Sequence, residues 1–269
     1  MVDTRLEGPV RIVGAGLLGA SIGLGLRARG VDVILVDSSA THLRLAIDYG
    51  AGRAASEQDE PKLIVVAVPP EQVAEVVARE LKAFPNALVT DVASVKLEPL
   101  EQLRAMGADV SRYIGTHPMA GRERGGPASA RADLFLARPW VIAGHDEISY
   151  RDAGPVEDLI LDLGATPIEL DVKRHDESVA LVSHVPQLVS SLMAARLAGA
   201  EDSAVALAGG GLRDVTRIAA SNPELWLQIL QANTEPVLEV LREFSADLAR
   251  VIEALSDLDQ RGARSAIVE

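Results

Sequence analysis

Short apolar runs alternate with amphipathic stretches through the first half of the chain. Apolar runs predict strands at residues 10–13, 31–36, 63–68, 87–91, 113–115, 140–143 and 166–168. Helical spacing predicts helices at residues 17–29, 41–49 and 71–82. The run at 63–68 is continuous, as expected of a central parallel strand that is buried on both faces. This alternation favours an α/β fold with a doubly wound sheet.

The pattern changes near Asp171. No strand is predicted after His175, and helices are predicted at residues 177–197, 204–208, 214–220, 224–233 and 235–255. Asn222 and Pro223 are typical of a helix start, with Asn as the cap and Pro in the first turn. We therefore predict a sheet domain over residues 1–171 and an all-helical domain over 172–269.

The longest predicted helix carries Val182, Val185, Val189 and Leu192 at helical spacing. A helical domain this small cannot easily cover its own apolar faces. The four side chains fit either an intramolecular core or the interface of a homodimer, and the pattern does not choose between them.

Composition narrows the classes of function. The formal net charge is −13, and an acidic surface repels phosphate backbones, so we expect no nucleic-acid partner. An anionic substrate would need a local basic pocket. The chain has no cysteine, which excludes disulfides and cysteine-ligated metals, and we predict no metal site. We find no signal peptide and no apolar run of membrane-spanning length, so we expect a cytoplasmic protein without membrane contact.

A glycine motif at residues 14–19 directly follows the first predicted strand and opens the first helix. In such motifs the first glycine permits the tight turn, the second lets a pyrophosphate approach the backbone, and the third lets helix and strand pack closely. Asp37 ends the second strand and can bind both ribose hydroxyls, which favours NAD over NADP. The alternative is an ordinary tight turn. The residues predicted to bind the cofactor are Gly14, Gly16, Leu17, Leu18, Gly19, Asp37, Val68 and Pro69.

Two of these residues have a second interpretation. Val68 and Pro69 end the buried strand at its carboxyl edge, where ligands bind in such sheets, but the prolines at 69 and 70 could simply stop the strand.

Candidate catalytic groups follow later strands. Ser94 could place a hydroxyl beside a nicotinamide and a substrate alcohol; alternatively it caps a helix, with Lys96 on the solvated face. His117, in the segment GTHPMAG, is flanked by Pro and small residues, and a neutral imidazole is a natural acceptor for an alcohol proton. A structural histidine is the alternative. Glu123 and Arg124 follow in a Gly-rich loop that could close over the site or form a mobile surface.

The helical half adds further candidates. His184 lies beside Pro186, which should kink the helix, and is either a pocket residue or a hydrogen-bonded core histidine. Arg213 and Arg217 lie one helical turn apart, and a guanidinium suits a carboxylate. Alternatively, the two arginines lie on a solvated helix face and form ion pairs with acids such as Asp214.

Together these motifs resemble the prephenate dehydrogenase family. The likeness runs from the glycine motif through GTHPMAG and SHVPQ to GGGLRDVTRIAASNPELW. The resemblance implies a Rossmann domain followed by a helical dimerisation domain. It also implies a homodimeric, NAD-dependent enzyme of tyrosine biosynthesis that converts prephenate to 4-hydroxyphenylpyruvate by oxidative decarboxylation.

The resemblance also implies residue roles. His117 matches the catalytic His that bonds the substrate's ring hydroxyl, and Ser94 matches a Ser that contacts that hydroxyl and the cofactor. Arg217 matches the Arg that holds a substrate carboxylate. The other matches in or near the substrate pocket are His184, Arg213, Trp226 and the loop acid Glu123. Gln187 stands where some members have a second His, which leaves the side-chain specificity open.

Three rival functions remain. Arogenate, with an amino group in place of the keto group, could be the substrate. A β-hydroxyacid dehydrogenase would need a catalytic Lys in the helical domain, and Lys173, the only lysine after Lys96, precedes the predicted helices. A non-catalytic NAD-binding dimer would bind NAD without turnover.

Overall fold

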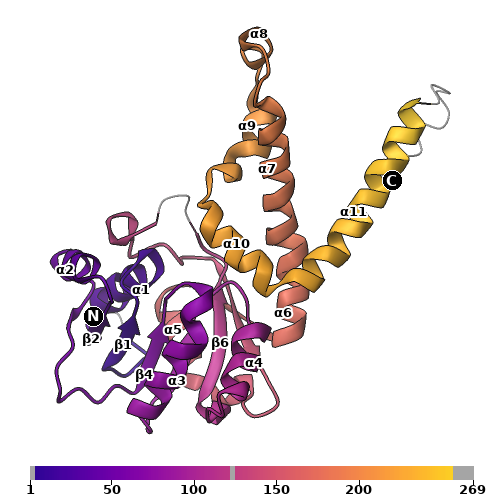
Figure 1. Ribbon diagram of the computed structural model, residues 1–269. Helices are drawn as coiled ribbons and strands as arrows, with labels where there is room; N and C mark the ends of the chain where they lie inside the picture. Colours follow the sequence, from indigo (N-terminus) through magenta and orange to yellow (C-terminus); the bar gives the residue numbers. More distant parts are fainter. Residues whose placement is uncertain (1–3, 122–124, 257–269) are drawn as a thin grey trace. The chain divides into compact units, whose positions relative to one another are not determined.

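The computed structural model describes residues 4–121 and 125–256 (Figure 1). Its eight strands form one sheet in the order β3-β2-β1-β4-β5-β6-β7-β8. Neighbouring strands from β3 to β6 are parallel, β7 runs antiparallel to β6, and β8 is parallel to β7. The doubly wound α/β plan is therefore confirmed. The strands are β1 (Val10–Val13), β2 (Val33–Val36), β3 (Arg53–Ala54), β4 (Leu63–Val66), β5 (Leu88–Asp91), β6 (Tyr113–Pro118), β7 (Pro139–Gly144) and β8 (Thr166–Asp171).

Helices cover both faces of this sheet, as the side chains of β4 show. Leu63 and Val65 join the apolar cluster that contains residues of α1 (Leu17–Ala28) and α5 (Gly154–Asp162). Ile64 and Val66 join the cluster of α3 (Val73–Ala83) and α4 (Leu97–Ala105). Because successive side chains of a strand point to opposite faces, a strand packed on both sides is apolar throughout. The remaining helix of this region is α2 (Ala40–Asp48).

Several elements differ from the sequence prediction. Strand β3 and helices α4 and α5 were not predicted. Helix α3 begins at Val73 because residues 70–72 form a separate 3-10 turn. Strand β6 extends to Pro118, so His117 lies within the strand and pairs with Val141 of β7.

The second half is helical, and the described residues after β8 contain no strand, as predicted. A π-helical turn at Ala180–His184 separates α6 and α7, because Pro186 has no N–H to donate to the preceding turn. The helices are α6 (Val172–Val179), α7 (Val185–Leu197), α8 (Asp202–Val205), α9 (Gly210–Thr216), α10 (Pro223–Ala232) and α11 (Thr234–Ser256), with a 3-10 turn at Arg217–Ala220.

The chain forms two compact units. The first is Met1–Asp176 together with Ala220–Ala232, and the second is Glu177–Ala219 together with Asn233–Glu269. Helix α10 thus groups with the sheet. The domain boundary at residue 171 stays a prediction.

The helical stretch Val172–Leu197 is long and apolar enough to cross a bilayer by length and composition alone. The π-helical turn interrupts it, and it carries buried polar side chains at His175, Asp176, His184 and Gln187. The expectation of no membrane contact stays a prediction.

Candidate active site

The first group of predicted site residues lies at the carboxyl ends of four parallel strands. The glycine motif follows β1, Val68 and Pro69 follow β4, and Ser94 follows β5. His117 lies near the carboxyl end of β6. Since β1, β4, β5 and β6 are consecutive in the sheet, all these residues lie along one edge. Ligands of open α/β sheets bind at this edge.

The glycine motif has the backbone that a dinucleotide site requires. Gly14 has φ +103°, and a Cβ there would lie 2.3 Å from the carbonyl oxygen of Ala67. A Cβ on Gly19 would lie 1.9 Å from the carbonyl oxygen of Gly14. A Cβ on Gly16 would meet nothing within 4 Å, so the space above it is open. The outer glycines therefore make the turn, and the middle one leaves room for a ligand.

The start of α1 adds an electrostatic feature. Gly16 is its N-cap, without a side-chain hydrogen bond, and the first turn, which includes Leu17 and Leu18, has no acidic residue. A helix N-terminus of this kind offers N–H donors and a partial positive charge to an anion. A bound pyrophosphate would fit here.

Asp37 braces the turn from the end of β2. Its Oδ2 accepts a hydrogen bond from the Ala15 N–H at 2.6 Å, and its Oδ1 accepts one from the Ser39 N–H at 2.7 Å. Each carboxylate oxygen has two lone-pair sites, so both can still accept a hydrogen bond from a ribose hydroxyl. Val68 lies close to Gly14, because its Cγ1 is 3.3 Å from the position of a Gly14 Cβ. Asp37 and Val68 therefore fit a dinucleotide beside this turn.

A buried polar network lies beneath the same edge, between β5 and β6. The carboxylate of Asp91 forms an ion pair with Lys96 and accepts hydrogen bonds from the Tyr113 hydroxyl at 2.7 Å and the Ala93 N–H at 2.8 Å. Burial lowers the pKa of Lys96, and the Asp91 carboxylate opposes that shift. Burial also raises the pKa of Tyr113, and Asp91 adds to the shift.

The position of Lys96 corrects one sequence interpretation. The expectation of a solvated Lys96 is wrong, because its ammonium is fully buried against Asp91. Ser94 is not the cap of α4 either: the N-cap residue is Lys96, and Ser94 lies half-buried in the loop before it. Its role as a catalytic residue stays a prediction.

His117 is held by two residues that sequence reasoning missed. Its Nδ1 lies 2.9 Å from Nε2 of His175, and Nδ1 of His175 lies 2.7 Å from Oδ1 of Asp176. Asp176 also accepts hydrogen bonds from the N–H groups of Lys96 and Leu97, each at 2.9 Å. His175 is fully buried and His117 is 8% exposed. A titratable side chain supported in this way at a ligand-binding edge is a candidate general base.

Other predicted site residues lie in the second unit. The Asn233 side-chain amide is 3.1 Å from Nδ1 of buried His184, and the Gln187 amide donates to the carbonyl oxygen of Ile218 at 3.0 Å. Arg213 and Arg217 are exposed, on α9 and at the start of the following turn. Trp226 is half-buried on α10, in the first unit, and Glu123 and Arg124 lie outside the described residues. A substrate-binding role for these residues stays a prediction.

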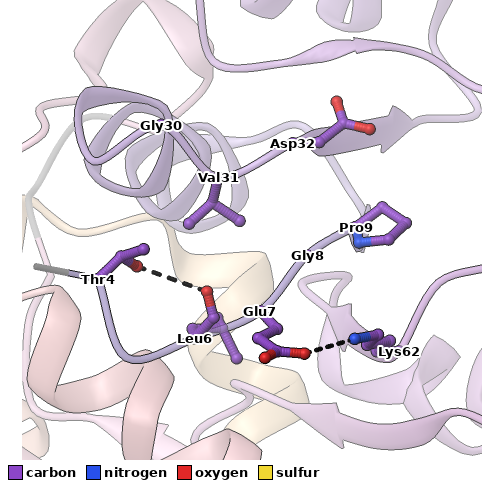
Figure 2. A pocket seen from close by; sticks show the side chains of 9 residues that line it. All are labelled: Thr4, Leu6, Glu7, Gly8, Pro9, Gly30, Val31, Asp32 and Lys62. Atoms are coloured by element: carbon purple, nitrogen blue, oxygen red, sulfur yellow. Dashed lines mark hydrogen bonds and ion pairs between the residues drawn. The ribbon is translucent and has the colours of Figure 1, made fainter.

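A shallow hollow of about 470 Å³ lies at the opposite end of the strands (Figure 2). Residues at the starts of β1, β2 and β4 line it. The ion pair of Lys62 with Glu7, at 2.6 Å, lies at its side. The amino ends of the strands are not where such sheets bind cofactors. This hollow is therefore separate from the candidate site.

The fold and the glycine turn define a Rossmann-type nucleotide-binding protein with a helical second half. Residues 22–168 match the family model described as prephenate dehydrogenase, nucleotide-binding domain, and residues 171–266 match prephenate dehydrogenase, dimerization domain. The chain belongs to the prephenate dehydrogenase family of oxidoreductases.

Individual relatives agree with this assignment. The probable prephenate dehydrogenase NovF of Streptomyces niveus is 39% identical over 248 residues, covering 91% of this chain and 68% of NovF. Synechocystis arogenate dehydrogenase is 28% identical, with a TM-score of 0.77 over 96% of this chain and 95% of that one. Prephenate dehydrogenase from A. aeolicus, solved with hydroxyphenyl propionate and NAD+, shares the fold at 22% identity, with a TM-score of 0.86 over 99% and 96% of the two chains.

The glycine geometry predicts that two matched substitutions affect different properties, one NAD binding and the other stability. Gly16→Ala should leave the melting temperature unchanged but weaken NAD binding at least about tenfold, because the methyl group enters only the ligand's space. Gly19→Ala should lower the melting temperature, because its methyl group meets the Gly14 carbonyl. Calorimetric titration and thermal unfolding measure both; unchanged NAD affinity in Gly16→Ala would contradict the assignment.

The buried ion pair predicts a coupled loss of stability. Asp91→Asn should reduce the free energy of unfolding by about 3–5 kcal/mol, because buried Lys96 loses its anion. Adding Lys96→Met should recover part of that loss. Urea unfolding of both single variants and the double variant measures the coupling, and strictly additive losses would mean that the two side chains do not interact.

Proposed function

We propose that this chain catalyses the NAD-dependent oxidative decarboxylation of prephenate to 4-hydroxyphenylpyruvate, a reaction of tyrosine biosynthesis. Membership of the family supports the reaction class. One observation carries the proposal: His117, supported by His175, lies on the same sheet edge as the glycine turn. An alcohol dehydrogenation needs a proton acceptor beside a dinucleotide site, and this edge supplies both groups.

When bound, NAD supplies the acceptor for the hydride that leaves the carbinol carbon. His117 takes up the developing charge of the hydroxyl by accepting its proton, and Ser94 contacts the same hydroxyl. The substrate ring then loses carbon dioxide and becomes aromatic, which makes the reaction irreversible. The ribose partner is Asp37, whose carboxylate would repel a 2′-phosphate, and this supports NAD over NADP.

Arg217 is assigned to a substrate carboxylate. A guanidinium binds a carboxylate through two parallel hydrogen bonds, and a protein of net charge −13 needs such a local cation to attract an anionic substrate. We assign Arg213, His184, Gln187 and Trp226 to the surroundings of the same substrate.

Arogenate is the second candidate substrate. The similarity to Synechocystis arogenate dehydrogenase supports it, and Gln187 stands at the position where some family members have a second His. NADH formation on prephenate and on arogenate, measured separately, decides between the two: a kcat/KM at least tenfold higher on arogenate would overturn the preference for prephenate.

We also propose that the protein is a cytoplasmic homodimer. The second half matches the family's dimerization domain. Apolar side chains at four-residue spacing lie exposed along α11, drawn in yellow in Figure 1, at Phe244, Leu248 and Ile252. A second copy of the chain would cover this stripe.

The roles of His117 and Arg217 predict different kinetic losses. His117→Asn should lower kcat about 100- to 10,000-fold with little change in KM, because it removes the proton acceptor. Arg217→Ala should mainly raise the KM for prephenate. His145→Asn is the matched control, because the His145 ring bonds the Tyr113 carbonyl and is given no catalytic role. Wild-type turnover in His117→Asn would show that the role of His117 is wrong.

The apolar stripe predicts how the dimer can be disrupted. Leu248→Glu should shift the protein toward monomer, because a carboxylate would be buried at the interface. Met106 is a similarly exposed apolar residue in the first unit, so Met106→Glu should leave the dimer intact. Light scattering after gel filtration gives both masses; a monomeric wild type at micromolar concentration would contradict the proposal.

A further inference from the structure

Two buried polar residues of the first unit support His117 and have been given no catalytic role of their own. His175 and Asp176 lie in the middle of α6, the helix that directly follows β8, and both side chains are almost fully buried. We propose that they are positioning residues that fix the tautomer of His117, with the proton on Nδ1 and the lone pair on Nε2. The catalytic consequence rests on the proposed function.

The acceptor at one end fixes the direction of both hydrogen bonds in the series Asp176–His175–His117. An ionised carboxylate accepts hydrogen bonds and donates none, so the proton in the 2.7 Å contact belongs to Nδ1 of His175. In neutral His175 the other ring nitrogen, Nε2, then carries the lone pair. The 2.9 Å contact therefore requires His117 to donate from its Nδ1.

Neutral His117 in this tautomer carries its lone pair on Nε2. That nitrogen is the one that can accept a proton from a substrate hydroxyl, because Nδ1 is committed to His175. The opposite tautomer would place a proton on Nε2, and His117 could not then act as the base. The hydrogen bonds from Asp176 through His175 thus hold His117 in the tautomer that can act as a base before substrate binds.

The surroundings keep this arrangement in place. Asp176 is fixed by the N–H groups of Lys96 and Leu97 at the start of α4, so its carboxylate cannot rotate without losing them. The two imidazole rings meet edge to face, with centroids 5.1 Å apart and planes at 69°. His175 is shielded from solvent, so bulk water does not compete for its ring nitrogens.

A pair of substitutions at one position separates tautomer control from packing. His175→Phe keeps a ring of similar size but offers no acceptor, so kcat on prephenate should fall at least about tenfold with KM unchanged. His175→Gln can present its carbonyl oxygen to Nδ1 of His117, so it should lose less of kcat than His175→Phe. Equal losses in the two variants, or a His175→Phe enzyme with wild-type kcat, would overturn the proposal.

Imidazole ¹⁵N chemical shifts of the wild-type protein give a second readout, which does not depend on turnover. The chain has five histidines, so selective labelling gives a spectrum that single substitutions can assign. His117 should appear as the Nδ1–H tautomer. His145 is an internal reference of the opposite kind, because its Nε2 must donate to the Tyr113 carbonyl at 2.9 Å.

The two measurements distinguish failure of this inference from failure of the proposed function. A wild-type His117 in the Nε2–H form would overturn the inference, whatever the enzyme turns over. A wild-type protein that is inactive on both prephenate and arogenate would overturn the proposed function. The ¹⁵N spectrum would still decide whether His175 and Asp176 control the tautomer of His117.

Discussion

The carboxylate of Asp176 is the contact on which the arrangement of the candidate site depends. It joins α6 to the start of α4 by accepting hydrogen bonds from two backbone N–H groups, and it orients His175, which in turn holds His117. Beside it, Asp91 ties Lys96 and Tyr113 together beneath the same loop. A buried polar network is stable only when each group has its partner, so these side chains hold one another in a single geometry.

Sequence reasoning identified the parts of the fold that local signals determine. The glycine turn, its partner Asp37 and the buried strand β4 each leave a short-range pattern, and the structure places them at one sheet edge. Helix α5 was missed because Gly154 and Pro155 at its start resemble a loop, although Pro is well tolerated in the first turn of a helix. Strand β6 was predicted too short because Pro118 stands at its end.

The supporting residues of the site could not be predicted in the same way. Lys96 and Asp176 are 80 positions apart in the chain, and His117 and His175 are 58 apart. The partner carboxylate of Lys96 is only five positions away, at the end of the preceding strand, but a lysine in the loop after a strand gives no sign that its charge is buried. The adjacent pair His175 and Asp176 after a strand was the available signal, and polar residues at a helix start are usually taken as solvated.

We propose that this chain couples oxidation of prephenate to loss of its ring carboxylate. The most direct test is the stoichiometry of the wild-type reaction, with NADH measured by absorbance and carbon dioxide trapped from the same sample. One carbon dioxide should form for each NADH, with 4-hydroxyphenylpyruvate as the organic product. NADH formed without carbon dioxide, or no NADH formed at all, would contradict it.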